Sequence, residues 1–198
     1  NLAALANKNG INTFHGYLDD KAMNPIKNGA DLLLASNVFA HADDLKSMAE
    51  AMKKLIKPDG KIIIEVQYLL NTIRDLTFDN IYHEHTNYWS LSSLNIFFEK
   101  LNLKIFKVEK INTHGGSIRV YVSQDSNILV DQSVQIILKE EEEFGLKNIS
   151  TYLEFRKKIE NLKTEVVKKI KILKEKYSSI IGYGAPAKAT TALNFFNI

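Results

Sequence analysis

Two short apolar runs, Asp31–Ser36 and Lys61–Val66, constrain the fold of this chain more than any other feature. Each run is almost continuously apolar, which is typical of a strand buried on both faces of a parallel sheet. Between them, apolar residues at helical spacing predict a helix that begins after Asp43 or Asp44 and ends before Lys57. Strands separated by a helix of this length indicate right-handed crossovers. We therefore predict an α/β fold with helices on both faces of the sheet.

The elements before the first run are short. Residues 1–8 have a helical pattern and are followed by Asn9-Gly10, a pair that often ends helices. A brief strand is predicted at Ile11–Phe14, and Asp19-Asp20 is expected to begin a short helix that ends before Pro25. The chain starts without a helix cap and stops within an apolar helix, so we expect it to be an internal part of a longer protein.

After the second run the pattern changes. Ser90 is expected to cap an amphipathic helix, and Lys104–Ile111 and Ser117–Gln124 are predicted strands joined by a loop or an antiparallel return. Residues 130–178 are almost entirely helical, with one apolar stripe that favours packing across a domain surface over a free coiled coil. Ile180-Ile181 is interpreted as a short strand before a further helix, which is how a second Rossmann-like unit would begin.

Composition excludes several classes of protein. Lys and Arg number 26 against 23 Asp and Glu, and the net charge of +3 is too small to predict binding to nucleic acid or to an anionic membrane. There is no cysteine, so this stretch holds no disulfide, no thiolate nucleophile and no cysteine-ligated zinc. The apolar runs are far shorter than the roughly 20 residues that span a bilayer. We expect a cytoplasmic protein, and composition does not predict its oligomeric state.

The densest polar cluster lies at residues 79–88 and contains two histidines, His83 and His85. In an extended backbone these two would share one face, with Tyr82 and Glu84 on the other. Three interpretations remain open: general acid–base catalysis by a histidine beside a carboxylate, a metal site of the His-x-His type, or a polar loop without a role.

A second cluster, Asn37 and His41, directly follows the first apolar run. Ligands of open parallel sheets bind beyond the carboxyl ends of the strands, so both residues are placed for a site. A helix cap or an ordinary surface histidine is the alternative.

Two glycine-containing segments could approach an anion. His114-Gly115-Gly116-Ser117 precedes Arg119, which could pair with a carboxylate or phosphate, although a simple hairpin turn explains the glycines equally well. Gly182-Tyr183-Gly184 leads through a proline to Lys188 and a helix start, where backbone N–H groups favour anions. It is neither a Walker A loop nor a complete G-x-G-x-x-G motif.

Together, in this order and spacing, the four motifs resemble the sugar-nucleotide C-methyltransferases, which use S-adenosylmethionine (SAM) to methylate a carbon of a dTDP-linked keto-deoxysugar. The resemblance covers essentially the whole chain. It implies part of a class I (Rossmann-like) SAM-methyltransferase sheet at residues 1–126. Residues 127–198 would be a helical connector and the beginning of a C-terminal Rossmann-like domain that binds a nucleotide-diphosphate sugar. The glycine-rich SAM loop and a cysteine-ligated zinc domain are expected upstream.

The resemblance also implies roles. His85 is the expected general base, with His41 as its competitor or a substrate-positioning partner, while Tyr82 and Glu84 orient the sugar and stabilise charge. Asn37 is expected beside the methionine part of SAM. Substrate-binding residues are expected at His83, Tyr88, His114, Gly115, Gly116, Ser117, Arg119, Tyr183 and Lys188.

No metal is expected at the histidine cluster. His83 and Glu84 are adjacent and face opposite ways in an extended segment, so they do not converge with His85 on one ion. Two other functions remain: a non-catalytic nucleotide-sugar-binding or assembly fragment, and a metal-dependent hydrolase or epimerase that uses this cluster.

Overall fold

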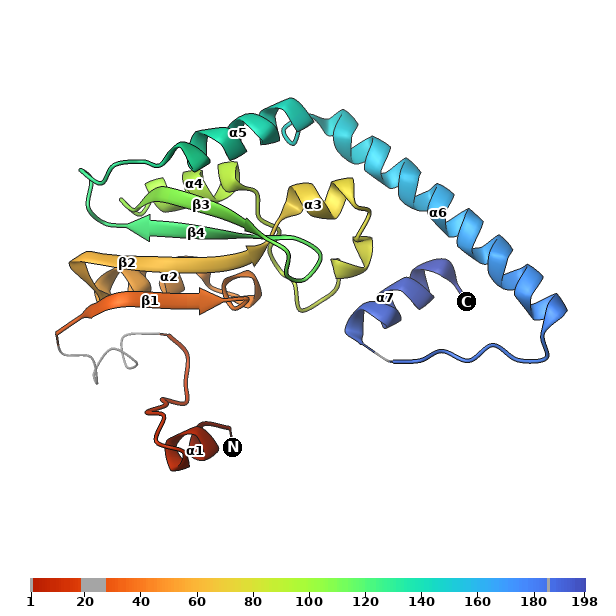
Figure 1. Cartoon of the computed structure of the whole chain (residues 1–198), viewed down its shortest axis with the longest axis horizontal. Helices are drawn as coiled ribbons and strands as arrows, with labels where there is room; N and C mark the ends of the chain where they lie inside the picture. The colour runs from red at the N-terminus through yellow and green to blue at the C-terminus, as the bar shows by residue number, and fades with distance from the viewer. Residues whose placement is uncertain (1, 19–27, 185) are drawn as a thin grey trace.

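The computed structural model describes residues 2–18, 28–184 and 186–198, which are built around a mixed four-stranded sheet (Figure 1). Its strands are β1 (Ala30–Ser36), β2 (Ile56–Gln67), β3 (Lys104–Ile111) and β4 (Ser117–Ser123), in the spatial order β1-β2-β4-β3. β1 and β2 are parallel, and β4 is antiparallel to both of its neighbours. The predicted α/β class, the parallel pair and the antiparallel return are confirmed.

Helices cover one face of this sheet. α2 (Leu45–Leu55), α4 (Leu91–Glu99) and α5 (Gln132–Phe144) bury their apolar residues in one core together with alternate residues of the strands. The fully buried hydrophobic strand residues are Ile62, Ile64, Ile118, Val120 and Val122. In Figure 1, α2 and α4 lie behind the sheet.

The opposite face of the sheet is open among the described residues. Leu32 and Leu34 of β1 are 51% and 66% exposed, so the prediction that this strand is buried on both faces is wrong for the described part of the chain. Successive strand residues point to opposite faces, and only the alternate set reaches the helical layer. The exposed apolar pair explains why the run seemed continuous in the sequence.

Helix starts are fixed by side chains that the sequence indicated. Asp44 caps α2 by accepting a hydrogen bond from the Ser47 N–H at 2.9 Å. Ser90 caps α4 in a reciprocal pair with Ser93. The buried carboxylate of Glu141, which belongs to α5, also accepts hydrogen bonds from the N–H groups of Leu91 and Ser92. A negative group at a helix N-terminus is favourable, so Glu141 ties α5 to α4.

Two of the shorter predicted elements do not form. Ile11–Phe14 and Ile180-Ile181 contain no strand and pair with no strand among the described residues. A strand needs a neighbour for its backbone hydrogen bonds, and without one these apolar side chains stay exposed. α1 (Leu2–Lys8) does form and ends before Gly10, while the expected helix after Asp19-Asp20 lies outside the described residues.

The C-terminal helices contact the core sparingly. A break at Gly145, whose φ of 80° suits glycine, separates α5 from α6 (Ile149–Lys176). Of the described residues of α6, only Ile159 is buried, with Phe155 packed against the core nearby. Figure 1 shows the rest of α6 extending away from the sheet. The predicted packing across a domain surface therefore holds only for the first turns.

The last helix, α7 (Ala187–Phe196), lies back toward the sheet domain (Figure 1). Its Phe195 and Phe196 rings lie 5.0 and 5.5 Å from the ring of Phe78, between centroids. Phe78 belongs to the short 3₁₀ helix η2 (Phe78–Asn80), which precedes the histidine cluster. α7 and the extended residues before it are what the structure describes of the expected second Rossmann-like unit.

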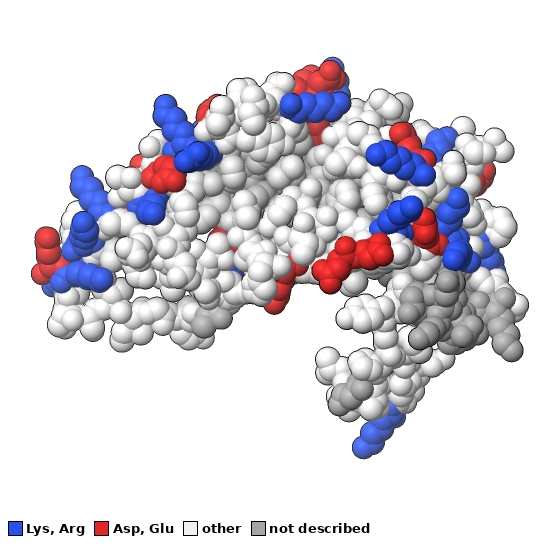
Figure 2. Space-filling model, turned by 180° about the vertical axis from the view of Figure 1, so that it is seen from behind, with Lys and Arg blue, Asp and Glu red and all other residues white. Residues whose placement is uncertain are grey.

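Surface charge is mixed. On the face seen in Figure 2, Lys and Arg lie beside Asp and Glu without a large area of one sign, in keeping with the small net charge of +3. Within the described ranges, no helix combines the length and the apolar character needed to cross a bilayer.

Candidate active site

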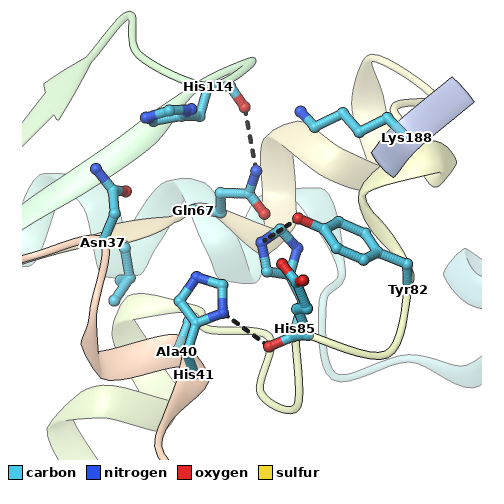
Figure 3. Close-up of a pocket in the computed structure, with 10 residues that line it drawn as sticks. Asn37, Ala40, His41, Gln67, Tyr82, His85, His114 and Lys188 are labelled. Atoms are coloured by element: carbon cyan, nitrogen blue, oxygen red, sulfur yellow. Dashed lines mark hydrogen bonds between the residues drawn. The ribbon is translucent and has the colours of Figure 1, made fainter. Parts of the chain in front are cut away.

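A cavity of about 240 Å³ lies where β1 and β2 end, the edge predicted from the strand order. It is bordered by the 3₁₀ helix η1 (Phe39–His41), the polar cluster at residues 79–88 (the histidine segment), the loop before β4 and the start of α7 (Figure 3). Its lining residues are Asn37, Ala40, His41, Val66, Gln67, Tyr82, Glu84, His85, His114 and Lys188. Seven of these were predicted as site residues from the sequence.

Asn37 stands at the turn out of β1. Its φ of 53° lies in the left-handed region, which asparagine tolerates better than most residues. Its N–H donates to the Glu65 carbonyl at 3.0 Å, which extends the β1–β2 pairing by one bond. The chain then enters η1, where the fully buried Phe39 stacks on Phe98 at 5.7 Å and leaves His41 at the cavity.

Two backbone carbonyls fix the tautomers of the cavity histidines. Nδ1 of His41 lies 2.8 Å from the Glu84 carbonyl oxygen, and Nδ1 of His85 lies 2.7 Å from the Asn80 carbonyl oxygen. A carbonyl oxygen only accepts, so each Nδ1 must carry the proton. In the neutral imidazoles the lone pair is therefore on Nε2. The two rings lie 4.9 Å apart between centroids (Figure 3).

His85 is held in a state suited to a base. Burial lowers its pKa because the charged imidazolium loses hydration, and electrostatic interaction with His41 and Lys188 acts in the same direction. The hydrogen bond to Asn80 opposes this shift in pKa. The hydroxyl of Tyr82 lies 3.4 Å from Nε2 of His85, the atom to which it can donate.

The histidine segment is a turn rather than an extended strand. The His85 N–H donates to the Tyr82 carbonyl at 3.0 Å, which folds the backbone around His83 and Glu84. The predicted shared face of His83 and His85 is therefore wrong. The His83 side chain is 87% exposed at the tip of the turn, while His85 turns back into the cavity.

Arg119 is placed away from the cavity, on the open face of the sheet. Its Nε donates to a Glu65 carboxylate oxygen at 2.7 Å, and a second guanidinium nitrogen lies 3.5 Å from Glu109. The side chain of Glu65 also accepts from Ser36 at 3.0 Å. The structure thus gives this arginine protein partners rather than bringing it to the other predicted site residues.

The glycine-containing loop before β4 forms a tight turn beside the cavity. Gly116 has a φ of 101°, and a Cβ there would lie 2.0 Å from Nδ2 of Asn71, so only glycine fits this turn. Ser117 is buried and donates to the Thr113 carbonyl at 3.0 Å. The loop presents His114 to the cavity. Of the nine predicted substrate-binding residues, only His114 and Lys188 line the cavity. The other seven lie outside its lining: His83, Tyr88, Gly115, Gly116, Ser117, Arg119 and Tyr183.

Lys188 reaches the cavity from α7 (Figure 3). Tyr183, in the preceding segment, is fully exposed. The aromatic contact between α7 and η2 holds this part of the chain beside the histidines. A lysine from the C-terminal segment therefore shares one cavity with residues that are more than 100 positions earlier in the sequence, such as His41 and His85.

Gln67 lines the cavity but was missed in the sequence. It is the last residue of β2, directly after the apolar run that ends at Val66. The strand-end rule that selected Asn37 after β1 would have selected Gln67 after β2. A lone glutamine outside any motif gave no other signal.

Metal ligation is not supported by the geometry seen. Among the described residues, no group of three or more His, Cys, Asp or Glu side chains could hold a metal ion. The expectation that the histidine cluster binds no metal stays a prediction for the purified protein.

Some solved structures are similar at low identity. The mitomycin 7-O-methyltransferase MmcR is 17% identical with a TM-score of 0.45, covering 61% of this chain and 37% of that one. The O-methyltransferase NcsB1 from neocarzinostatin biosynthesis, solved with SAM and 2-hydroxy-5-methyl naphthoic acid, is 15% identical with a TM-score of 0.46, covering 62% and 37%.

Family models and a curated relative are more specific. Residues 4–108 match a model described as a methyltransferase domain, and residues 112–198 match one described as a C-methyltransferase C-terminal domain. C-methyltransferase NovU of Streptomyces niveus is 32% identical over 197 residues, which are 98% of this chain and 47% of that protein. The chain thus spans about half the length of this relative. It belongs to the methyltransferase family, and its C-terminal part is similar to the C-terminal domain of C-methyltransferases.

Proposed function

We propose that this protein transfers the methyl group of SAM to a carbon next to the ketone of a keto-deoxysugar carried on a nucleotide diphosphate. The observation that carries the proposal is the pair of histidines whose Nε2 atoms are left unprotonated at one cavity by the carbonyls of Asn80 and Glu84. The match of residues 112–198 to the C-terminal domain of C-methyltransferases supports carbon as the methyl acceptor.

The proposed chemistry begins with a proton transfer. A carbon beside a ketone is not nucleophilic until it loses a proton, and the electron pair of the broken C–H bond then becomes an enolate. His85 accepts this proton on Nε2. The Tyr82 hydroxyl, which lies 3.4 Å from that nitrogen, is placed to donate to the enolate oxygen. Glu84 orients the sugar at the same edge.

SAM would supply an electrophilic methyl group on a sulfonium ion: as the new C–C bond forms, the S–CH₃ bond would break and the neutral thioether S-adenosylhomocysteine would leave. The cavity fits the amino-acid end and the thioether stem of this cofactor, because the Asn37 carboxamide offers a donor and an acceptor beside the apolar Ala40 and Val66. Asn37 would hold the methionine part, and His85 would face the sugar from the other side.

Lys188 and His114 would contact the nucleotide-diphosphate sugar. The lysine adds positive charge at the cavity mouth, where an anionic substrate enters.

We propose the domain division at residues 126 and 127 on physical grounds. β4 (Ser117–Ser123) lies between β2 and β3 in the sheet and so belongs with the methyltransferase domain, although the family matches divide between residues 108 and 112.

The test uses the full-length enzyme, by which we mean the longer protein that we expect to contain this chain. It is incubated with SAM and a dTDP-linked keto-deoxysugar, and the product is analysed by mass spectrometry and carbon NMR. We expect one added methyl group on a carbon adjacent to the ketone. Methylation on oxygen, or binding of the sugar nucleotide without any transfer, would contradict the proposal; the latter outcome favours a non-catalytic binding role.

A further inference from the structure

The side-chain amide of Gln67 lies between the His114 loop and the histidine segment (Figure 3). Its Nε2 donates to Oδ1 of Asn80 at 3.1 Å and to the carbonyl oxygen of His114 at 3.3 Å. The backbone carbonyl can only accept, which fixes the nitrogen of this amide toward it. Both N–H groups of Gln67 are therefore used within the protein.

Asn80 links Gln67 to His85. Its side chain accepts from Gln67, and its main-chain carbonyl accepts the Nδ1 proton of His85 at 2.7 Å. Asn80 is only 2% exposed, so water does not readily replace a lost partner of its side-chain oxygen. The end of β2 and the imidazole of His85 are thus connected through one buried residue.

The connection matters because of the tautomer. A neutral histidine in water favours the form with the proton on Nε2, which leaves no lone pair there. The Asn80 carbonyl reverses this preference by accepting from Nδ1, and it does so only while residue 80 keeps its place.

We propose that Gln67 is a positioning residue for His85: by holding Asn80, it maintains the protonated Nδ1 of His85 and an unprotonated Nε2. The effect on the imidazole is a property of the folded chain. Its catalytic consequence rests on the proposed function.

The experiment compares the full-length enzyme with Gln67→Met, which keeps the length of the side chain and removes both donors. Nitrogen-15 NMR of labelled histidines reports which ring nitrogen of His85 carries the proton, with the signal assigned from His85→Gln. We expect Nδ1–H in the wild type and a shift toward Nε2–H in Gln67→Met. Exchange of the acidic substrate proton with deuterium, followed with a dTDP-linked keto-deoxysugar, should fall about tenfold, a part of what a positioned base contributes.

Gln124→Met is the matched control. Gln124 also donates from Nε2 to two carbonyl oxygens, those of Ile56 and Lys57 at 3.3 and 2.8 Å, at the opposite end of the sheet. Its loss should cost similar stability and leave the His85 tautomer and the exchange rate unchanged. If Gln67→Met does not fold, Asn80→Leu cuts the same hydrogen bond from its other end and should shift the tautomer in the same direction.

The outcomes separate the inference from the function. A folded Gln67→Met with an unaltered His85 tautomer overturns the positioning role. So does a tautomer shift of equal size in Gln124→Met. A tautomer shift that occurs only in Gln67→Met supports the positioning role, even when proton exchange is unaffected. Unaffected proton exchange in that variant would instead count against His85 as the base.

Discussion

The sheet domain and the C-terminal helices differ in how their positions are fixed. Around the sheet, side chains such as Phe39, Ile64 and Phe98 are fully buried in one continuous core. In α6 and α7, only Ile159 is buried among the described residues. The histidines therefore belong to the well-packed sheet domain, whereas Lys188 reaches the same cavity from a helix held by a few aromatic contacts. The proposed base His85 and the lysine Lys188 should therefore respond differently to mutations in the two regions.

The largest effect is expected for His85→Ala in the full-length enzyme. A positioned general base contributes roughly 10²–10⁴-fold to the rate, and its loss is felt in the transition state. We expect kcat for methyl transfer to fall within that range while KM changes little, as steady-state kinetics would show. A rise in KM with kcat unchanged would mean that His85 only binds substrate.

The second effect concerns stability in the two regions. Phe98→Ala removes a fully buried ring and should lower the free energy of unfolding by about 3–5 kcal/mol. Ile172→Ala in α6, where the side chain is 52% exposed, should change it by less than about 0.5 kcal/mol. Urea denaturation measures both. Equal losses would show that α6 is buried against something in the full-length protein.

A smaller effect is expected where the two regions meet. Phe195→Ala removes the closer of the two ring contacts with Phe78, at 5.0 Å. Such pairs contribute about 0.5–1.5 kcal/mol, so KM for the sugar nucleotide should rise roughly two- to tenfold as Lys188 loses its position. Tyr177→Ala, at the exposed end of α6, is the control and should leave KM unchanged. A fall in kcat alone would argue that α7 acts on the histidines instead.

The smallest effect is a pH dependence of stability. Burial lowers the pKa of His85 in the folded protein, so at mildly acidic pH the unfolded chain binds more protons than the folded one. This contribution to the free energy of unfolding is complete above a pH of about 6.5 and is lost as pH falls through the window just below it. Urea titrations should show a shallower loss in His85→Gln across that window. Identical pH slopes would place the imidazole in water.

Much of the fold could be predicted because its elements carry local signals. The apolar runs marked β1 and β2, and the caps Asp44 and Ser90 marked two helix starts. The predicted strands at Ile11–Phe14 and Ile180-Ile181 were wrong because a strand depends on a partner strand that the local sequence does not reveal.

The site was predictable in its location more than in its membership. The end of a predicted strand placed Asn37 and His41 at the site, whereas Gln67 belongs to no motif and was missed. An extended backbone would place His83 and His85 on one face. Instead, the backbone hydrogen bond from His85 to Tyr82 forms a turn, and the two side chains point to different surroundings. Arg119 looked available for an anion because its partner Glu65 is distant in sequence and adjacent only in the sheet.

The central claim is that His85, in the sheet domain, removes the substrate proton. It is tested most directly by deuterium exchange at the carbon beside the ketone of a dTDP-linked keto-deoxysugar, without SAM, in the wild type, His85→Ala and His41→Ala. We predict exchange in the wild type, a loss of roughly 10²-fold or more in His85→Ala, and a smaller loss in His41→Ala. Exchange that persists in His85→Ala and disappears in His41→Ala would contradict the claim and assign the base to His41.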